Sequence, residues 1–423
     1  MVEINADTLS GPTHHFGGLS FGNVASTQHE GILSCPKKAA LQGLEKMKLF
    51  YELGVPQLIF PPHLRPLVLT LKQLGFSGSE QNIVESVYKS HPDLLLMCSS
   101  SSAMWTANTA TITPSKDALD GKVHFTPANL ASNLHRAIEV AFSAKVLRCI
   151  FADSRYFRHH QPLPSAYEFF DEGAANHTRF SNGLQLFVYG RKADSTIRPT
   201  KYPARQTKEA QMAIARLHCL PEEKLLFFQQ NPAAIDSGVF HNDVISTGYG
   251  KLFLYHEDAF VETSKKIKQL ERHFPDIECI QVTKKELSLH QAVTSYLFNS
   301  QIIESEPNEK LLLICPTECK QLSFLQKLTP HPFDDILFVD LRQSMMNGGG
   351  PACLRLRIEV TDKEMKAIHK GVFFTLQLYK EIQQAINKWY PDTFTITDLL
   401  DADFRKSCKV AHEKIVSLLQ LEL

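Results

Sequence analysis

The sequence predicts an α/β fold, and three observations support this prediction. Short apolar runs of strand length alternate with longer segments of helical spacing along the whole chain. Hydrophobic residues make up 43% of the 423 positions, which is typical of a globular core. No low-complexity tract or solenoid-length repeat interrupts the pattern. We therefore expect a parallel or mixed sheet core with helices packed outside it.

Strands are expected where apolar residues form short continuous runs, because strands buried on both faces have this composition. In chain order these runs are 57–60, 94–98, 184–190, 225–228, 251–255, 277–282, 311–315 and 336–340.

Helices are expected where apolar residues recur at intervals of three and four. In 36–53 this spacing places residues such as Leu44 and Met47 on one helical face. Segments 370–390 and 409–421 have similar patterns. The chain thus offers an amphipathic helix near its start and two more near its end.

Two long segments, 11–35 and 99–130, have little periodicity and are rich in Gly, Ser, Thr and Asn. Segments of this kind in compact folds are often substrate-binding loops or lids. The polar stretch 193–203 contains two prolines and is either a linker or a surface excursion within one domain. We favour a single domain over residues 1–423.

The charge is balanced, with 45 Lys and Arg against 45 Asp and Glu. This balance argues against a general binder of nucleic acid or of a membrane surface, which would need excess cations. We therefore expect a small-molecule partner. The nine cysteines are odd in number and widely spaced, and the polar start of the chain lacks a signal-peptide pattern. The apolar runs are also too short for a bilayer. We expect a soluble protein of the reducing cytoplasm.

The segment MNGGGPACLRLR presents the first candidate for chemistry, Cys353. Three glycines and a proline force an irregular turn, and Leu354, Leu356 and Ile358 then alternate as in a strand. The segment is either a glycine turn beside an inert buried cysteine or a thiol presented to a substrate. No zinc site is expected, because the pair Cys315 and Cys319 has no second pair at suitable spacing.

Two further segments could assist such a thiol. The segment VFHNDVIS (239–246) alternates like a strand, which would place His241 and Asp243 on one face, either solvated or beside a substrate. In DEGAANHTR (171–179), Glu172 could orient a histidine as general base, although an acidic pair at a turn is common.

Arginines could bind the carboxylates of a substrate. Arg136, which follows His135, and Arg205 in YPARQT are candidates, because a guanidinium donates two parallel hydrogen bonds in carboxylate geometry. Most arginines, however, only solvate a surface.

Taken together, these segments resemble the N-succinylarginine dihydrolase family of the guanidino-group-modifying superfamily. The order and spacing of the shared segments carry the resemblance through nearly the whole chain, most weakly after about residue 360. They are GPTHHFGGLSFGNVAS (11–26), LGFSGS (74–79), AMWTANTAT (103–111), GKVHFTPANL (121–130), DEGAANHTR (171–179), LQLFVYGR (184–191), YPARQT (202–207), QQNPAAIDSGVFHNDVIS (229–246), YLFNSQ (296–301) and NGGGPACLRLR (347–357).

The resemblance implies an α/β propeller of the pentein type, with five ββαβ-type modules around a pseudo-fivefold axis. It implies that Cys353 is the nucleophile, His241 the general acid/base and Glu172 its acidic partner. The implied substrate contacts are Gly17, Gly18, Leu19, Ser20, Phe21, Gly22, Asn23, Val24, Ala25, Ser26, Asn108, His135, Arg136, Arg205, Asp243 and Asn347.

The implied reaction converts N2-succinyl-L-arginine and two waters to N2-succinyl-L-ornithine, two ammonia and carbon dioxide, in arginine catabolism by the succinyltransferase pathway. No metal or organic cofactor is implied. A substrate with one guanidinium and two carboxylates needs a bipolar pocket, with Glu172 and Asp243 expected at one end and Arg136 and Arg205 at the other.

Three questions stay open at this point. A deiminase that stops after one ammonia would need the same residue types. A catalytically silent binding protein on the same fold is a second alternative, against which the intact trio Cys353, His241 and Glu172 argues. The oligomeric state is also open, with a homodimer as one alternative.

Overall fold

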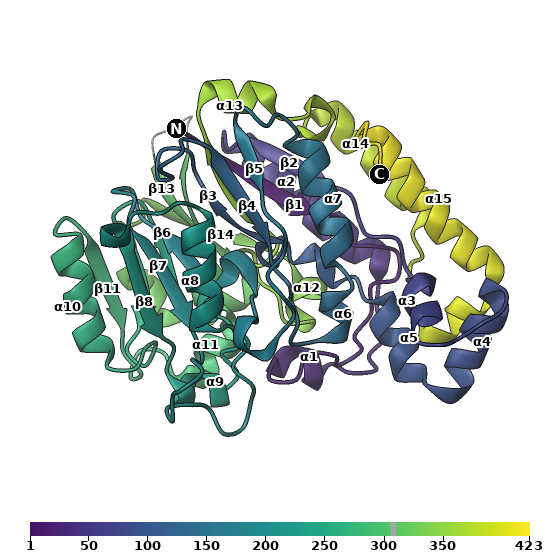
Figure 1. Ribbon diagram of the computed structural model, residues 1–423, viewed down its shortest axis with the longest axis horizontal. Helices are drawn as coiled ribbons and strands as arrows, with labels where there is room; N and C mark the ends of the chain where they lie inside the picture. The colour runs from purple at the N-terminus through teal and green to yellow at the C-terminus, as the bar shows by residue number, and fades with distance from the viewer. Residues whose placement is uncertain (306–309) are drawn as a thin grey trace.

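The computed structural model describes residues 1–305 and 310–423 (Figure 1). Its strands form five sheets of three strands each. In every sheet the middle strand pairs antiparallel with one neighbour and parallel with the other. The sheets are β15-β1-β2 (Leu356–Val360, Val2–Thr8, Gln57–Phe60), β3-β4-β5 (Ala110–Thr113, Val123–Pro127, Phe157–His159), β6-β7-β8 (His177–Arg179, Gln185–Tyr189, Leu225–Gln229), β9-β10-β11 (Ser246–Tyr249, Leu252–His256, Glu278–Val282) and β12-β13-β14 (Gln301–Ser305, Lys310–Pro316, Asp335–Val339).

A helical crossover joins the middle strand of each sheet to its parallel neighbour, as parallel pairing requires. These crossovers contain α2 (Pro36–Glu52), α7 (Val140–Ile150), α8 (Lys208–Leu217) and α10 (Thr263–His273), and in the last sheet the short 3₁₀ turns η8 (Thr317–Gln321) and η9 (Ser323–Lys327). The predicted ββαβ unit therefore recurs five times. Because β15 pairs with β1, the two ends of the strand sequence meet in one sheet.

The antiparallel outer strands of neighbouring sheets lie against one another. Strand β15 contacts β3, and β9 contacts both β6 and β12. In an antiparallel pair, the start of one strand lies beside the end of the other. Loops that precede the outer strands therefore gather with loops that follow the middle strands, and this topology positions the candidate site. The arrangement around a pseudo-fivefold axis stays a prediction.

Additional helices cover the first module. The helices α14 (Leu376–Trp389) and α15 (Ala402–Leu418) run along one side of the molecule (Figure 1) and pack on each other, and α14 also packs on α2. Apolar side chains from these helices and from β1, β2, β4 and β15 form one buried cluster. The helices α3 (Val68–Gln73), α4 (Glu80–Ser90) and α5 (Pro92–Ser99) enclose a separate small core.

Most predicted elements are confirmed, and four need correction in type or extent. Run 94–98 is helix α5 and not a strand, because Pro92 opens a helix and the run is rich in leucine, a strong helix former. Helix 370–390 begins only at Leu376, where Thr375 caps it, and the final helix begins earlier than predicted, at Ala402 behind the Asp401 cap. Segment 99–130, expected to be a loop, contains β3 and β4.

The stretch 193–203 is a surface excursion and not a boundary between modules. It lies between β7 and α8 of one ββαβ unit. The carboxylate of Asp236 accepts hydrogen bonds from the backbone N–H groups of Thr200, Lys201 and Tyr202 and so holds it in place. In the described parts of the chain, none of the helices has the length and apolar character needed to cross a membrane.

Stability is expected to fall as the pH drops from about 6.5 towards 4. Burial lowers the pKa of His177 to about 4, so the folded protein binds fewer protons than the unfolded chain between these values. Above pH 6.5 the imidazole of His177 is neutral in both states and no stability is lost. Below pH 6.5 the free energy of unfolding falls, on the order of 1 kcal/mol per pH unit. Urea unfolding at pH 7 and pH 5 measures this loss, which should be smaller in a His177→Gln variant. An equal loss in both proteins would contradict the assignment.

Candidate active site

The glycine turn before Cys353 allows three side chains to approach its backbone closely. A Cβ atom at Gly348 would lie 2.0 Å from the amide of Asn23, and one at Gly349 would lie 2.1 Å from Nε1 of Trp105. A Cβ atom at Gly350 would lie 2.6 Å from Oδ1 of Asn299. Gly348 also has φ +86°, which favours glycine. The three glycines are therefore required by packing, and the turn is tightly held.

The thiol of Cys353 is buried, with 3% of the residue exposed. Its Sγ accepts a hydrogen bond from Nδ2 of Asn299 at 3.1 Å and lies 3.5 Å from Oδ2 of Asp243, to which the thiol can donate. The predicted strand begins three residues later, at Leu356, so Cys353 lies in the turn before β15. Burial raises the pKa of the Cys353 thiol well above its usual value, and the charge of Asp243 adds to this effect. The resting thiol is therefore protonated at neutral pH.

His241 and Glu172 form a buried pair. Nε2 of His241 lies 2.9 Å from Oε2 of Glu172, and both residues are 1% exposed. A carboxylate only accepts hydrogen bonds, so Nε2 carries the proton and Nδ1 is the nitrogen available for proton transfer. Among the residues that the structure describes, Nδ1 has no hydrogen-bond partner.

The strand predicted for 239–246 is wrong. Asn242–Val244 forms the short 3₁₀ turn η6, and β9 begins only at Ser246. His241 and Asp243 therefore do not share a strand face. The turn still places Asp243 beside the thiol and His241 beside Glu172, so it links the His241–Glu172 pair to Cys353.

Glu172 is held in its orientation by contacts from three other segments. Its Oε1 accepts a hydrogen bond from Oγ of Ser132 at 2.6 Å, and its backbone N–H donates to Oε1 of Gln206 at 2.8 Å. Nδ2 of Asn108 donates to its carbonyl oxygen at 2.7 Å. Burial acts to raise the pKa of Glu172, but the hydrogen bond and charge of His241, with the charges of Arg136 and Arg205, outweigh it and lower the pKa to about 2. Glu172 is therefore ionised at working pH.

The pocket was expected to hold its acidic residues at one end and its arginines at the other, and this expectation is wrong for Arg136. Its NH1 lies 4.0 Å from Oε2 of Glu172, and its guanidinium lies over the ring of Trp105. Within the described structure, Nε and NH2 of Arg136 are buried without hydrogen-bond partners. The positive charge thus sits next to the His241–Glu172 pair, with N–H donors free for an anionic group.

Arg205 lies beside the loop 17–26. Its NH2 donates to the carbonyl oxygen of Phe21 at 2.8 Å, and its guanidinium lies 5.1 Å from the ring centre of Phe240. His135 is buried as well, and burial together with the charges of Arg136 and Arg205 lowers its pKa well below the usual value. It is therefore neutral.

The loop 17–26 joins the turn of Cys353 through two asparagines. Nδ2 of Asn23 donates to the carbonyl oxygen of Gly348 at 3.1 Å, and Oγ of Ser26 donates to Oδ1 of Asn347 at 3.4 Å. Asn23 also caps α1 (Val24–Gln28). The other predicted members of the loop differ in exposure. Phe21 is exposed, Ser20 and Gly22 are buried, and Gly17, Gly18 and Leu19 are half-buried. Val24 and Ala25 line an outer cavity with Tyr296.

The topology explains why these residues meet. Asn108, Glu172, His241, Asn299 and Cys353 each lie shortly before the outer strand of a different module, namely β3, β6, β9, β12 and β15. The loop 17–26, His135–Arg136 and Arg205 follow the middle strands β1, β4 and β7. Antiparallel pairing brings both sets to the same edge of their sheets.

Cys353, Asp243, Asn299, His241 and Glu172 with the residues that contact them form the Cys353 cluster. Sequence reasoning missed several residues of this cluster. They are Ser132 and Gln206, which hold Glu172, Asn299, which contacts the thiol, and Tyr296, whose buried hydroxyl has no partner in the described structure. Gln206, Tyr296 and Asn299 belong to YPARQT and YLFNSQ, so the resemblance marked their segments without assigning them a role. Ser132 had no signal of its own.

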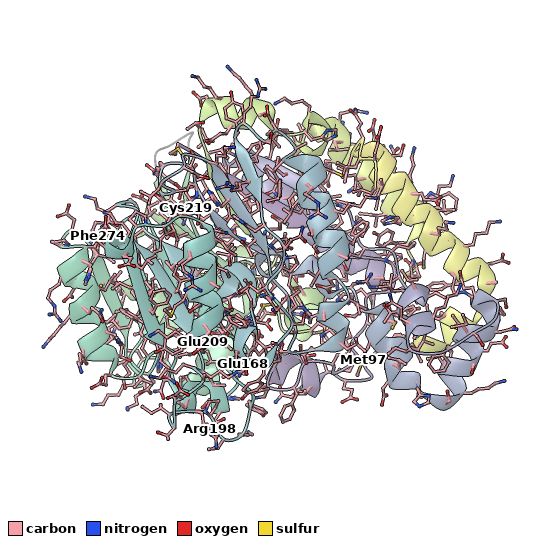
Figure 2. The ribbon with its side chains drawn as sticks, in the orientation of Figure 1. Met97, Glu168, Arg198, Glu209, Cys219 and Phe274 are labelled. Atoms are coloured by element: carbon pink, nitrogen blue, oxygen red, sulfur yellow. The ribbon has the colours of Figure 1, made fainter. Side chains whose placement is uncertain are left out.

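One group of possible metal ligands lies outside the cluster. Donor atoms of Asp120, His124 and Cys219 lie within 4.8 Å of one another. Cys219 follows the end of α8 opposite Glu209 (Figure 2). The carboxylate of Asp120 already accepts from Arg158 and pairs with His124, so its oxygens are engaged. No role in the cluster follows for this group.

Comparison with known proteins gives one consistent family. A family model described as succinylarginine dihydrolase matches residues 1–423. The N-succinylarginine dihydrolase of Pseudomonas syringae pv. tomato is 45% identical over 436 residues, covering 99% of this chain and 97% of that protein. The protein of the same name from Shewanella baltica is 44% identical over 433 residues, with the same coverage.

Solved structures support the fold. The N-terminal domain of ArgZ, a cyanobacterial arginine dihydrolase, bound to its product, matches with a TM-score of 0.54 and 13% identity, over 85% of this chain and 99% of that domain. Apo ArgZ matches with a TM-score of 0.55 and 14% identity, over 88% of this chain and 42% of that one. These matches show the pentein fold.

Proposed function

The chain belongs to the succinylarginine dihydrolase family, and we propose that it converts N2-succinyl-L-arginine and two waters to N2-succinyl-L-ornithine, two ammonia and carbon dioxide. Family membership makes it an enzyme of arginine catabolism that acts on a guanidino group. One observation supports the finer proposal. Where the outer strands of the modules begin, the structure holds a buried thiol with a carboxylate beside it and a histidine–carboxylate pair. We further propose a cytoplasmic location, which the nine free cysteines support.

Cys353 is the proposed nucleophile. A guanidinium carbon is a poor electrophile, so the reaction needs a thiolate. The thiol is protonated in the free enzyme, but a guanidinium bound against Asp243 would offset the charge that raises the pKa of Cys353. Oδ1 of Asp243 has no partner among the described residues, so both carboxylate oxygens are placed to contact substrate or thiol. Substrate binding itself thus favours the reactive thiolate.

His241 is the proposed proton carrier. As Sγ bonds to the guanidinium carbon, Nδ1 of His241 accepts the proton that the thiol loses, and it then gives this proton to one nitrogen, which leaves as ammonia. Nδ1 then takes a proton from the water that attacks the covalent adduct, and the C–S bond breaks. Glu172 fixes the ring through Nε2 and stabilises the imidazolium that forms.

The second half of the reaction repeats this chemistry on the neutral ureido group. Sγ attacks its carbon, the remaining terminal nitrogen leaves as ammonia with a proton from His241, and an S-carbamoyl adduct forms. Water releases a carbamate from the thiol, and the carbamate separates into carbon dioxide and the amine of succinylornithine. The urea carbon is less electrophilic, so N–H donors near its oxygen must polarise it. Nε and NH2 of Arg136 can supply them, because neither has a hydrogen-bond partner among the described residues, although Nε lies 3.8 Å from Oε2 of Glu139.

We expect two ammonia for each succinylarginine consumed, because the ureido product stays in a pocket able to react again. Incubation with N-succinylarginine, with ammonia measured against substrate loss and products identified by mass, tests this. Succinylornithine should accumulate, with little succinylcitrulline. A ratio of one with accumulating succinylcitrulline would indicate a deiminase, and no ammonia at all would indicate a binding protein.

A further inference from the structure

The segment YLFNSQ (296–301) carries no role in the mechanism above, yet it places an asparagine against the nucleophile. Asn299 ends the short 3₁₀ turn η7 (Leu297–Asn299), just before β12, and is fully buried. Four of the five modules already supply a residue to the mechanism or to the Glu172 cradle from this position. Asn299 is the residue of the fifth module.

Both ends of the Asn299 amide contact Cys353. Nδ2 donates to Sγ at 3.1 Å, and Oδ1 accepts from the backbone N–H of Cys353 at 3.1 Å. The carbonyl oxygen of Asn299 also accepts from the N–H of Ala352 at 2.9 Å. The contact of Oδ1 with a backbone donor decides the orientation of the amide, so an N–H group must face the sulfur. This orientation is the useful one, because a thiolate is only an acceptor.

The surroundings of the thiol make this donor important. The nearest carboxylate, Asp243, disfavours a negative charge on Sγ, and burial does the same. The side chain of Asn299 opposes both effects, and its Nδ2 also contacts the carbonyl oxygen of Asp243 at 3.3 Å, which ties the two residues together. A hydrogen bond to a charged group in a buried site is stronger than one to a neutral group.

We propose that Asn299 is a catalytic residue, whose Nδ2–H donates to Sγ of Cys353, stabilises the thiolate as it forms and aims it at the bound guanidinium carbon. This inference rests on the proposed function, in which Cys353 is the nucleophile. Removing the donor should lower kcat/KM by about 10- to 100-fold, the usual effect of one hydrogen bond to a charged group.

The first test needs no substrate. The ultraviolet absorbance of the thiolate is titrated with pH in wild type and Asn299→Asp, and each curve is corrected by the same titration after Cys353→Ser. The aspartate keeps the shape of asparagine but puts a carboxylate oxygen against Sγ. We expect the midpoint of the Cys353 titration to rise by at least about one pH unit. A midpoint equal to that of wild type would overturn the proposal.

Gln301→Ala is the matched control. Gln301 lies in the same segment and donates to the carbonyl oxygen of Pro351, so it supports the same turn without touching the sulfur. Its loss should leave the titration midpoint of Cys353 unchanged. If Gln301→Ala shifts the midpoint as far as Asn299→Asp does, the segment acts through loop structure alone and the proposal fails.

The second test uses turnover of succinylarginine across pH. In Asn299→Asp the acidic limb of kcat/KM should move upward while KM changes little, and Asn299→Ser, which keeps a short donor, should recover part of the loss. Should Asn299→Asp not fold by circular dichroism, Asn299→Ser and Asn299→Ala are compared in the same two measurements, with serine expected nearer to wild type. A parallel loss of rate at every pH in all variants would contradict the proposal. If wild type releases no ammonia, the proposed function fails, while the thiol titration still decides the role of Asn299.

Discussion

Replacing Cys353 by alanine is expected to abolish turnover of succinylarginine while leaving the fold and substrate binding largely intact. No covalent adduct can form without Sγ, and water is not a nucleophile comparable to the thiolate in this site. The turn itself should survive, because the packing of Gly348, Gly349 and Gly350 and the backbone contact with Asn299 do not depend on the sulfur. The rate of ammonia release should fall below about one hundredth of the wild-type kcat.

The control for this experiment is Cys279→Ala, which removes a half-buried thiol from β11, away from the Cys353 cluster. Its kcat should stay close to that of wild type. Calorimetry with succinylarginine should still detect binding to Cys353→Ala. A kcat for Cys353→Ala above about one hundredth of wild type would refute the covalent mechanism.

Free arginine is expected to be a poor substrate, with kcat/KM at least about 10²-fold below that of succinylarginine. The buried guanidinium of Arg205, linked to the loop 17–26 through Phe21, is available for a carboxylate of the succinylated substrate. Arginine lacks the succinyl group, so it would leave a buried donor unpaired. Comparable kcat/KM values for the two compounds would exclude this specificity.

Arg205→Lys tests which residue creates the discrimination. Lysine keeps the charge but loses the planar pair of donors that matches a carboxylate. We expect kcat/KM for succinylarginine to fall by about 10- to 100-fold while the low value for arginine changes little, so that the ratio narrows. Arg216→Lys, an exposed position on α8, should leave both values unchanged. Equal losses for both substrates with Arg205→Lys would assign Arg205 a structural role.

Local chemistry explains which elements could be predicted. The apolar run 311–315 formed a strand that is buried on both faces over most of its length. Run 225–228 also formed a strand, with Leu226 and Phe228 buried and Leu225 and Phe227 half-buried. Helix α2 formed where the sequence is amphipathic. The strand prediction for run 94–98 is wrong because a short leucine-rich run fits a strand or a helix equally well, and Pro92 favours the start of a helix. The strand prediction for segment 239–246 is wrong because its alternating apolar and polar residues belong to a buried 3₁₀ turn before β9.

The sequence by itself determined the chemical identity of the candidate groups: a cysteine after a glycine turn, a histidine, and acidic residues in recognisable segments. It also determined the family, through the order of those segments. It could not decide contacts between residues far apart in the chain. His241 and Glu172 are 69 positions apart, and Asn299 is 54 positions from Cys353. These residues, far apart in the sequence, meet only because five ββαβ modules bring the starts of their outer strands together at one site. For the same reason only the tertiary structure placed Arg136 beside Glu172 and turned the amide of Asn299 towards the sulfur, since both depend on partners that no local pattern encodes.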